Sequence, residues 1–257
     1  MASPKADNGD VDKDDIAPTT TTTMGTGLDT TVPTLVFDDS CPMCQIYTGA
    51  FSKLGWADRQ AFGSCDPDLT SQMDLDRARH EIPMFDPVTG QMQYGLDSLF
   101  TVIGGRLRWL RPLMALPIAK PAIRPIYALI SYNRRQIAGC PPPSDGFDCA
   151  PDFHVAWVST YIGLVGGATC ALASTPVGAA AAITSAIAAT ARLGPVALEA
   201  DRPKRFEVVS QAATSVLVGS AAARVAALCR MPAPVAAAIG IAAGVHQVVR
   251  RSFLRRG

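Results

Sequence analysis

Two cysteines separated by two residues, Cys41-Pro42-Met43-Cys44, are the side chains of this sequence best suited to chemistry. An apolar run of strand character at 34–37 precedes them, and apolar residues at helical spacing follow. The motif therefore stands where a strand ends and a helix begins. Unpaired N–H groups and the helix dipole at such a position stabilise a thiolate. We expect Cys41 to attack a disulfide and to be less covered than Cys44, which closes the intramolecular disulfide.

A zinc site is the alternative interpretation of this motif. Zinc sites built from one Cys-x-x-Cys pair need a second close pair of Cys or His ligands. Cys140 and Cys149 have eight residues between them, whereas His80 and Cys65 stand alone. The spacing favours redox chemistry, so we expect no metal and no cofactor besides the redox-active disulfide itself.

Three motifs in order carry a resemblance to a known family. They are V-F-D-x-x-C-x-x-C at 36–44, F-D-x-x-x-G and Y-G-L-D-S-L within 85–99, and I-Y-x-x-I-S-x-N-R-R at 126–135. Together they resemble the DCC family of predicted thiol-disulfide oxidoreductases, over about residues 33–139. The resemblance implies an α/β thioredoxin-like fold, with Cys41 as the attacking thiol and Cys44 as the resolving thiol.

Two aspartates precede the first cysteine, and each bears on its reactivity. Asp38 has two candidate roles, proton relay to or from Cys44 and hydrogen bonding to the loop that holds the motif. Asp39 stands where the family pattern has glycine. A carboxylate two residues from Cys41 opposes thiolate formation. The strength of Cys41 activation, and the direction of electron flow, therefore stay open.

Pro83 is a candidate for contact with substrate. It follows Cys44 by 39 residues and precedes an apolar strand pattern at 82–85. In thioredoxin-like folds generally, a cis-proline at this place faces the dithiol and offers backbone groups to the substrate. Most X–Pro bonds are trans, so both forms of the Ile82–Pro83 bond stay open. We expect Pro42, Ile82 and Pro83 to bind substrate.

Composition divides the chain into four parts. Residues 1–32 are polar and acidic, with a threonine run, and are predicted to be a disordered tail. Residues 33–139 form the α/β domain, in which prolines at 112, 117, 121 and 125 predict short helices after Arg106. Residues 140–152 are a Pro-rich linker. Residues 153–257 form an all-α region, predicted to be a four-helix membrane region.

The membrane prediction depends on charge. Residues 153–191 contain no Asp, Glu, Lys or Arg, and this length suffices for two spans and a turn. We expect spans near 153–173, 177–193, 206–228 and 233–250, with close-packing Gly-x-x-x-Gly faces at 163–167 and 240–244. An Ala-rich soluble bundle is the alternative. The loop between spans two and three and the C-terminus carry most of the basic residues: Arg192, Arg202, Lys204, Arg205, Arg250, Arg251, Arg255 and Arg256. The positive-inside rule then places the N-terminal domain and the C-terminus in the cytoplasm.

These observations predict a membrane-anchored thiol-disulfide oxidoreductase whose dithiol faces the cytoplasm. Its partners would be protein or small-molecule thiols and disulfides, and membrane lipid. The balanced net charge of +1 gives no reason to expect nucleic acid. The alternative is a non-enzymatic membrane protein whose head docks a partner or binds a metal. A less favoured hypothesis is an electron relay from Cys41 and Cys44 through Cys140 and Cys149 to the outer pair Cys170 and Cys229.

Overall fold

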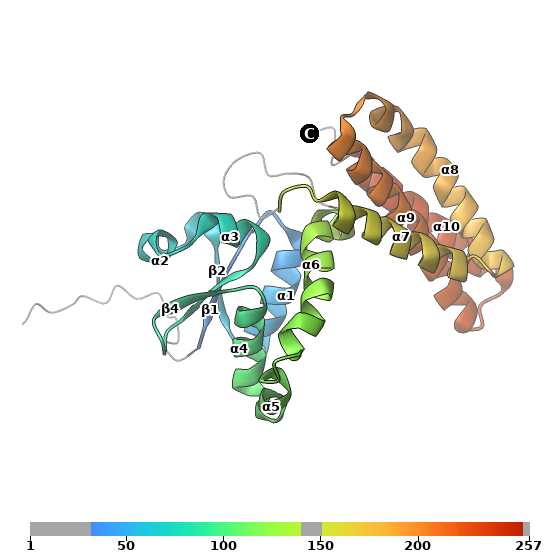
Figure 1. Ribbon diagram of the computed structural model, residues 1–257. Coiled ribbons are helices and arrows are strands. Elements are labelled where there is room, and N and C mark those ends of the chain that lie inside the picture. Colours follow the sequence, from blue (N-terminus) through green and yellow to red (C-terminus); the bar gives the residue numbers. More distant parts are fainter. Residues whose placement is uncertain (1–31, 140–150, 254–257) are drawn as a thin grey trace, which may run out of the picture.

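The N-terminal part of the chain is a small sheet enclosed by helices (Figure 1). The computed structural model describes residues 32–139 and 151–253. The strands are β1 (Thr34–Phe37), β2 (Asp58–Ala61), β3 (Pro83–Asp86) and β4 (Gln91–Tyr94). The helices are α1 (Pro42–Lys53), η1 (Phe62–Ser64), α2 (Pro67–Ser71), α3 (Leu75–His80), α4 (Leu96–Arg106), η2 (Arg108–Leu110), α5 (Arg111–Met114) and α6 (Ala119–Ala138).

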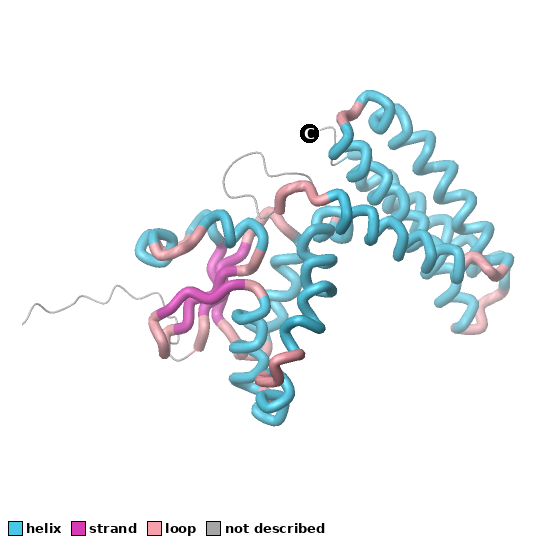
Figure 2. The backbone as a smooth tube through the Cα atoms, in the orientation of Figure 1, coloured by secondary structure: helices cyan, strands magenta, loops and turns pink. Residues whose placement is uncertain are grey.

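The sheet has the topology of a thioredoxin-like fold. Its strand order is β2-β1-β3-β4, with β1 and β2 parallel and β3 antiparallel to both of its neighbours. The parallel pair is joined by the crossover helix α1, whereas β3 and β4 form a hairpin closed by the turn at 87–90 (Figure 2). The predicted fold class is confirmed. Strand β2, which carries no apolar run, was not predicted.

Alternating side chains of β1 build a core on each face of the sheet. Leu35 packs with Ala57, Met84 and Val102 on the face covered by α1, α4 and α6. Val36, the next residue, packs on the opposite face, which α2 and α3 cover, with Met73, Ala78 and Tyr94. The motif that follows β1 is therefore held by a strand that is fixed from both sides.

Helix α6 is longer than its prolines predicted. The chain breaks at 115–118, but Pro121 and Pro125 lie within one helix of 20 residues. Pro121 falls in the first turn, where its missing N–H costs nothing. Pro125 removes one internal hydrogen bond, and the packing of α6 against α1, α4 and α7 compensates.

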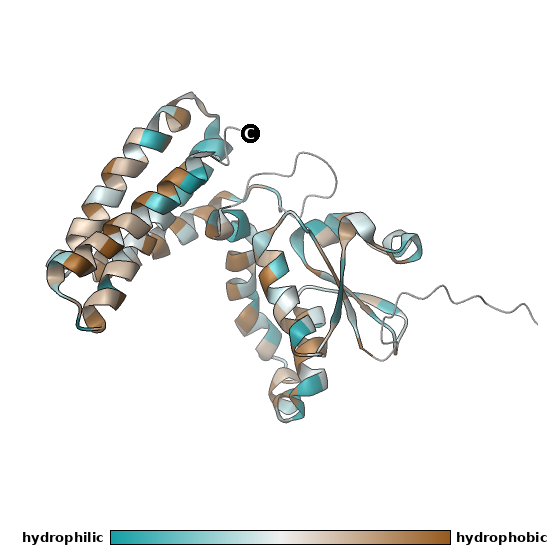
Figure 3. Ribbon diagram, turned by 180° about the vertical axis from the view of Figure 1, so that it is seen from behind, coloured by the Kyte–Doolittle hydropathy of each residue, from teal (hydrophilic) through white to brown (hydrophobic). Residues whose placement is uncertain are grey.

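Four long helices make up the rest of the described chain: α7 (Val155–Leu172), α8 (Pro176–Glu199), α9 (Arg202–Leu228) and α10 (Ala233–Phe253). All four are long and apolar enough to cross a membrane. The ribbon coloured by hydropathy shows brown and pale residues along this bundle (Figure 3). The four-helix prediction is confirmed at this level. The bent pair formed by η2–α5 and α6 would add a fifth if it counted as one broken span.

Small residues let α8, α9 and α10 approach closely. A Cβ built on Gly240 would lie 2.4 Å from the Ala223 Cβ and 2.7 Å from the Gly219 carbonyl oxygen. A Cβ on Gly244 would lie 1.9 Å from the Ser185 Oγ. The predicted packing face at 240–244 is therefore confirmed.

The equivalent prediction for α7 was wrong. A Cβ on Gly163 or Gly167 would meet nothing within 4 Å. The same spacing serves as a contact only where a second helix faces it, and α7 packs chiefly on α9 through its other side, where Val158, Tyr161 and Val165 are buried.

We predict that Gly240→Ala lowers the thermal stability of the full chain in detergent micelles. The added methyl group overpacks the α9–α10 contact, which typically costs about 1–3 kcal/mol. Gly167→Ala is the matched control, because its methyl group enters open space and alanine favours helix. Melting followed by circular dichroism should show a lower midpoint for Gly240→Ala only. Equal midpoints for both variants would contradict the packing described.

Candidate functional site

The two cysteines of the motif lie at the N-terminus of α1. Cys41 is the N-cap residue, and its Sγ accepts a hydrogen bond from the Cys44 N–H at 3.5 Å. Pro42 occupies the first turn, where no N–H is needed. A sulfur that receives a helix N-terminal N–H is held in the field that favours its thiolate form. Both side chains stand as thiols, three residues apart on one helical turn.

Both thiols are buried, which the sequence did not predict. Cys41 and Cys44 are each only 2% exposed and pack with Phe37, Met43 and Tyr47. The expectation that Cys41 is the less covered of the two was wrong, because the β1–α1 loop and its neighbours enclose both sulfurs equally. A disulfide in a large partner therefore requires local opening before it can reach either sulfur.

Tyrosines and an arginine from distant parts of the chain gather around Cys44. Burial, and secondarily the neighbouring Cys44, raise the pKa of the Tyr47 hydroxyl, which donates a hydrogen bond to the Cys44 side chain. Burial raises the pKa of Tyr127 to about 12. Arg134 opposes both shifts through its positive charge. At neutral pH these groups supply two un-ionised hydroxyls and one cation close to Cys44.

The sequence did not single out these three residues as site residues. Tyr127 and Arg134 belong to the third motif, and their spacing of seven residues places them on one face of α6. Tyr47 lies one turn after Cys44 on α1. These spacings could have indicated that the side chains share a face, but not that the two faces meet.

A small apolar cavity reaches the motif. Its volume is about 220 Å³, and it lies between α1, α4, α6 and the sheet. Met43, one of the two residues between the cysteines, is one of its walls, and most of the remaining lining is aliphatic or aromatic. The main lining residues are Met43, Tyr47, Phe51, Ile82, Leu99, Tyr127, Ile130 and Arg134. This is a space for an apolar group beside the dithiol helix.

Asp38 is buried and holds the motif loop. Its Oδ1 accepts hydrogen bonds from the Ser40 N–H at 2.8 Å and the Ser40 hydroxyl at 2.6 Å, and its carbonyl accepts from the Cys41 N–H. These contacts correspond to the loop-holding role; proton relay stays a prediction. Asp39 is exposed, and its carbonyl accepts a hydrogen bond from the Gln45 side chain. Solvent screens a carboxylate in that position, so its effect on Cys41 is weakened.

The Ile82–Pro83 bond is trans. The backbone of Ile82 is already used within the chain: its N–H donates to the Tyr127 hydroxyl at 3.4 Å, and its carbonyl accepts from the Gly95 N–H and the Ser98 hydroxyl. Backbone pairing with a substrate at Ile82, as predicted, would have to displace these bonds. The Ile82 side chain lines the apolar cavity, whereas Pro83 is buried at the start of β3.

The other cysteines lie apart from this site. Cys65 packs beside the α2–α3 core, and burial raises the pKa of its thiol. Cys170 and Cys229 are exposed at the ends of α7 and α9. Cys140 and Cys149, the middle pair of the relay hypothesis, lie outside the described residues. Within 32–139 and 151–253, no three His, Cys, Asp or Glu side chains gather as a metal site.

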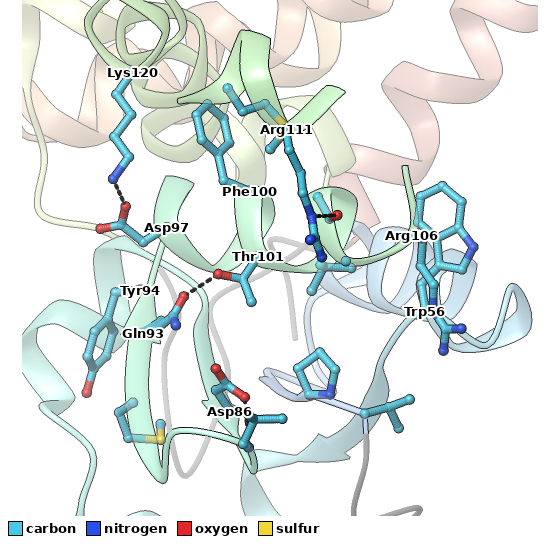
Figure 4. Close-up of a pocket in the computed structure, with 18 of the residues that line it drawn as sticks. Trp56, Asp86, Gln93, Tyr94, Asp97, Phe100, Thr101, Arg106, Arg111 and Lys120 are labelled. Atoms are coloured by element: carbon cyan, nitrogen blue, oxygen red, sulfur yellow. Dashed lines mark hydrogen bonds and ion pairs between the residues drawn. The ribbon is translucent and has the colours of Figure 1, made fainter. Parts of the chain in front are cut away.

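A second hollow of the head is larger than this cavity. It has a volume of about 980 Å³ and lies between β4, α4 and the α5–α6 turn (Figure 4). Its lining is mixed, with the Thr101 hydroxyl bonded to Gln93 and Lys120 paired with Asp97. None of the cysteines within 32–139 and 151–253 lines it. Despite its size, we therefore do not assign this hollow to the dithiol site.

Residues 35–140 match the model of the DCC1-like thiol-disulfide oxidoreductase family. The match covers the domain for which the three sequence motifs indicated this family. No curated protein and no solved structure matches the chain.

We predict that Tyr127→Phe removes one late-ionising phenol from the alkaline titration of the full chain. With its pKa raised to about 12, Tyr127 keeps its proton where an unfolded tyrosine, with a pKa of 10.0, has lost it. The stabilisation linked to this proton is complete below pH 10 and is lost as the pH rises towards 12. Phenolate absorbance of the wild type and variant should differ mainly above about pH 11. A difference centred near the ordinary tyrosine pKa would contradict the burial of this hydroxyl, and denatured wild type supplies the reference curve.

Proposed function

Because residues 35–140 match the DCC1-like thiol-disulfide oxidoreductase family, we propose that this protein is a membrane-anchored thiol-disulfide oxidoreductase. The observation that carries the proposal is the position of Cys41 as the N-cap of α1, with Cys44 on the same turn. The catalytic residues are Cys41 and Cys44, with no cofactor besides their disulfide. The substrates are protein or small-molecule thiols and disulfides.

In the reducing direction, the Cys41 thiolate attacks one sulfur of the substrate disulfide. A mixed disulfide forms at Cys41, and the other substrate sulfur leaves as a thiolate that takes up a proton. The Cys44 thiol then loses its proton and attacks the Cys41 sulfur. The Cys41–Cys44 disulfide forms, and the second substrate sulfur leaves as a thiol. Two electrons have passed to the substrate, and a dithiol donor must return them.

The surroundings support these steps. The Tyr47 hydroxyl donates to the Cys44 sulfur, and a donor at that atom stabilises the thiolate that attacks in the second step. Arg134 adds a positive charge that acts on the Tyr47 hydroxyl. The cavity walled by Met43 can hold an apolar side chain or ring of the substrate while its disulfide approaches Cys41. Proton relay through Asp38 belongs to this proposal as a further step.

We also propose that the head and the C-terminus share the cytoplasmic side of the membrane. The guanidinium of Arg251, at the end of α10, donates to the carbonyls of Gln136 and Ile137 at the end of α6. This contact supports an even number of crossings after the head. The basic residues at the start of α9 (Arg202, Lys204 and Arg205) and at the end of α10 support the cytoplasmic side through the positive-inside rule.

The burial of both cysteines favours a second candidate function, a non-enzymatic docking head. A head that only binds a partner has no need of accessible sulfurs, and each cysteine is 2% exposed. The two candidates differ in whether the dithiol turns over.

We predict that Cys41→Ser abolishes reduction of a small aliphatic disulfide by the dithiothreitol-reduced full chain. Cys44→Ser should instead accumulate a mixed disulfide at Cys41, because the resolving thiol is missing. Cys65→Ser, outside the site, is the matched control and should keep wild-type activity. Mass spectrometry of the trapped adduct identifies the attacking sulfur. A silent wild type would favour the docking head, whereas full activity in Cys41→Ser would contradict Cys41 as the attacking thiol.

We predict that reporters fused before residue 33 and after Gly257 read out on the same, cytoplasmic, side. Four crossings return the chain to the side on which it began. Opposite readouts would mean an odd number of spans, as when the bent η2–α5–α6 pair also crosses.

A further inference from the structure

The helical turn before the membrane bundle carries an exposed surface that the proposed function does not use. We call residues 108–130 the α5–α6 hairpin: η2, α5 and the N-terminal half of α6. The two helical arms, Arg108–Met114 and Ala119–Ala138, meet at 97°. The α5 end of the hairpin forms a tip of the head (Figure 1).

Large apolar side chains point outward along this hairpin. Seven of them are between 38% and 73% exposed: Trp109, Leu113, Leu116, Ile118, Ile123, Ile126 and Ile130. Single exposed apolar residues are ordinary on a soluble surface, but seven within 22 residues indicate a contact with a partner or a membrane. We therefore expect a partner or a membrane to shield these side chains from water.

The charge of this region indicates which kind of partner surface binds the hairpin. Residues 98–139 contain seven Lys or Arg and no Asp or Glu. Arg108 and Arg124 are exposed beside the apolar side chains, Lys120 pairs with Asp97, and Arg111 donates to the Gly104 carbonyl. A second copy docked face to face would bring these positive charges together. A surface of negative charge with an apolar interior fits both features.

We propose that the α5–α6 hairpin binds the surface of an anionic lipid bilayer, with its apolar side chains in the interfacial layer and its basic side chains at the lipid headgroups. Trp109 is the aromatic type that prefers this layer. Amphipathic helices rich in Lys and Arg bind such surfaces in the membrane plane. The bilayer would lie close to the hairpin, because α6 is followed in the chain by the candidate span α7 and packs against it.

This proposal rests on the membrane anchoring in the proposed function and adds a consequence for the dithiol. Tyr127 and Ile130 of α6 line the cavity beside Met43. If the outer side of α6 lies on lipid, the cavity and the cysteines are held close to the bilayer surface, where apolar substrates concentrate.

The test uses the full chain in nanodiscs, with tryptophan quenching by lipids brominated on their acyl chains. Trp56→Phe with Trp157→Phe leaves Trp109 as the single tryptophan. Two further variants lack all three native tryptophans: one carries Leu164→Trp, on the exposed side of the α7 span, and the other Leu75→Trp, exposed on α3 at the opposite face of the head. In discs with about one third anionic lipid, the tryptophans at positions 109 and 164 should be quenched several-fold more than the one at position 75.

Each outcome separates the two proposals. Strong quenching at position 164 with none at 109 keeps the membrane anchor and overturns the lipid-binding hairpin. No quenching at either position overturns the hairpin and the anchor together. Quenching at 109 that grows with protein density at fixed lipid composition assigns the surface to a second copy and overturns the proposal.

A charge variant tests the choice of anionic lipid. Arg108→Gln with Arg124→Gln should lower the quenching of Trp109 in anionic discs to the level found in zwitterionic discs. The same two substitutions in the Leu164→Trp variant should leave the quenching at position 164 unchanged, and they should leave the dithiol activity unchanged. Quenching of Trp109 that is equal in both lipids, with or without the two arginines, would overturn the proposed recognition of anionic headgroups.

Discussion

The last carbonyls of α6 have no partner within their own helix, and the guanidinium of Arg251, from the far end of the chain, supplies one. Gly139 ends α6 in the left-handed conformation, and a Cβ there would meet the Arg251 side chain at 3.1 Å. At the same junction the Asn133 amide donates to the Trp157 carbonyl of α7. A helix of the dithiol domain is in this way capped and held by the helices of the bundle. The two parts of the chain are therefore mechanically coupled.

The opposite side of α6 holds the dithiol domain through the segment 79–82. Tyr127 accepts from the Ile82 N–H, the Ser131 hydroxyl donates to the His80 carbonyl, and Arg134 donates to the Arg79 carbonyl. These three residues recur at helical spacing and lie on one face of α6. This face therefore forms hydrogen bonds with backbone groups at the end of α3 and just before β3. Any displacement of α6 by the helical bundle would reach this segment and the cavity beside it.

The site combines an activating position with a closed environment. A helix N-terminus favours a reactive thiolate at Cys41, whereas 2% exposure of both cysteines restricts access to it. The walls that close the site come partly from α6, which also contacts the bundle. Coupling between α6 and the site offers a physical route from the four-helix bundle to the access of the dithiol.

Local pattern decided much of this protein. The apolar run at 34–37, the Cys-x-x-Cys motif and the helix after it follow from spacing alone, because each depends on neighbours in the chain. The uncharged stretch 153–191 likewise determines two helices of membrane length. Strand β2 could not be predicted from local pattern, because this edge strand has mostly polar side chains and forms by pairing with the β1 backbone.

Tertiary structure decided what depends on contact between distant segments. The same glycine spacing occurs at 163–167 and 240–244, but only the second meets a facing helix. Likewise, Tyr47 and Arg134 lie 87 positions apart, and only the packing of α6 against α1 brings the charge of Arg134 to the Tyr47 hydroxyl. Sequence spacing reports which residues share a face of one element. Which faces meet, and how deeply a thiol is then buried, is set by the packing of the whole chain.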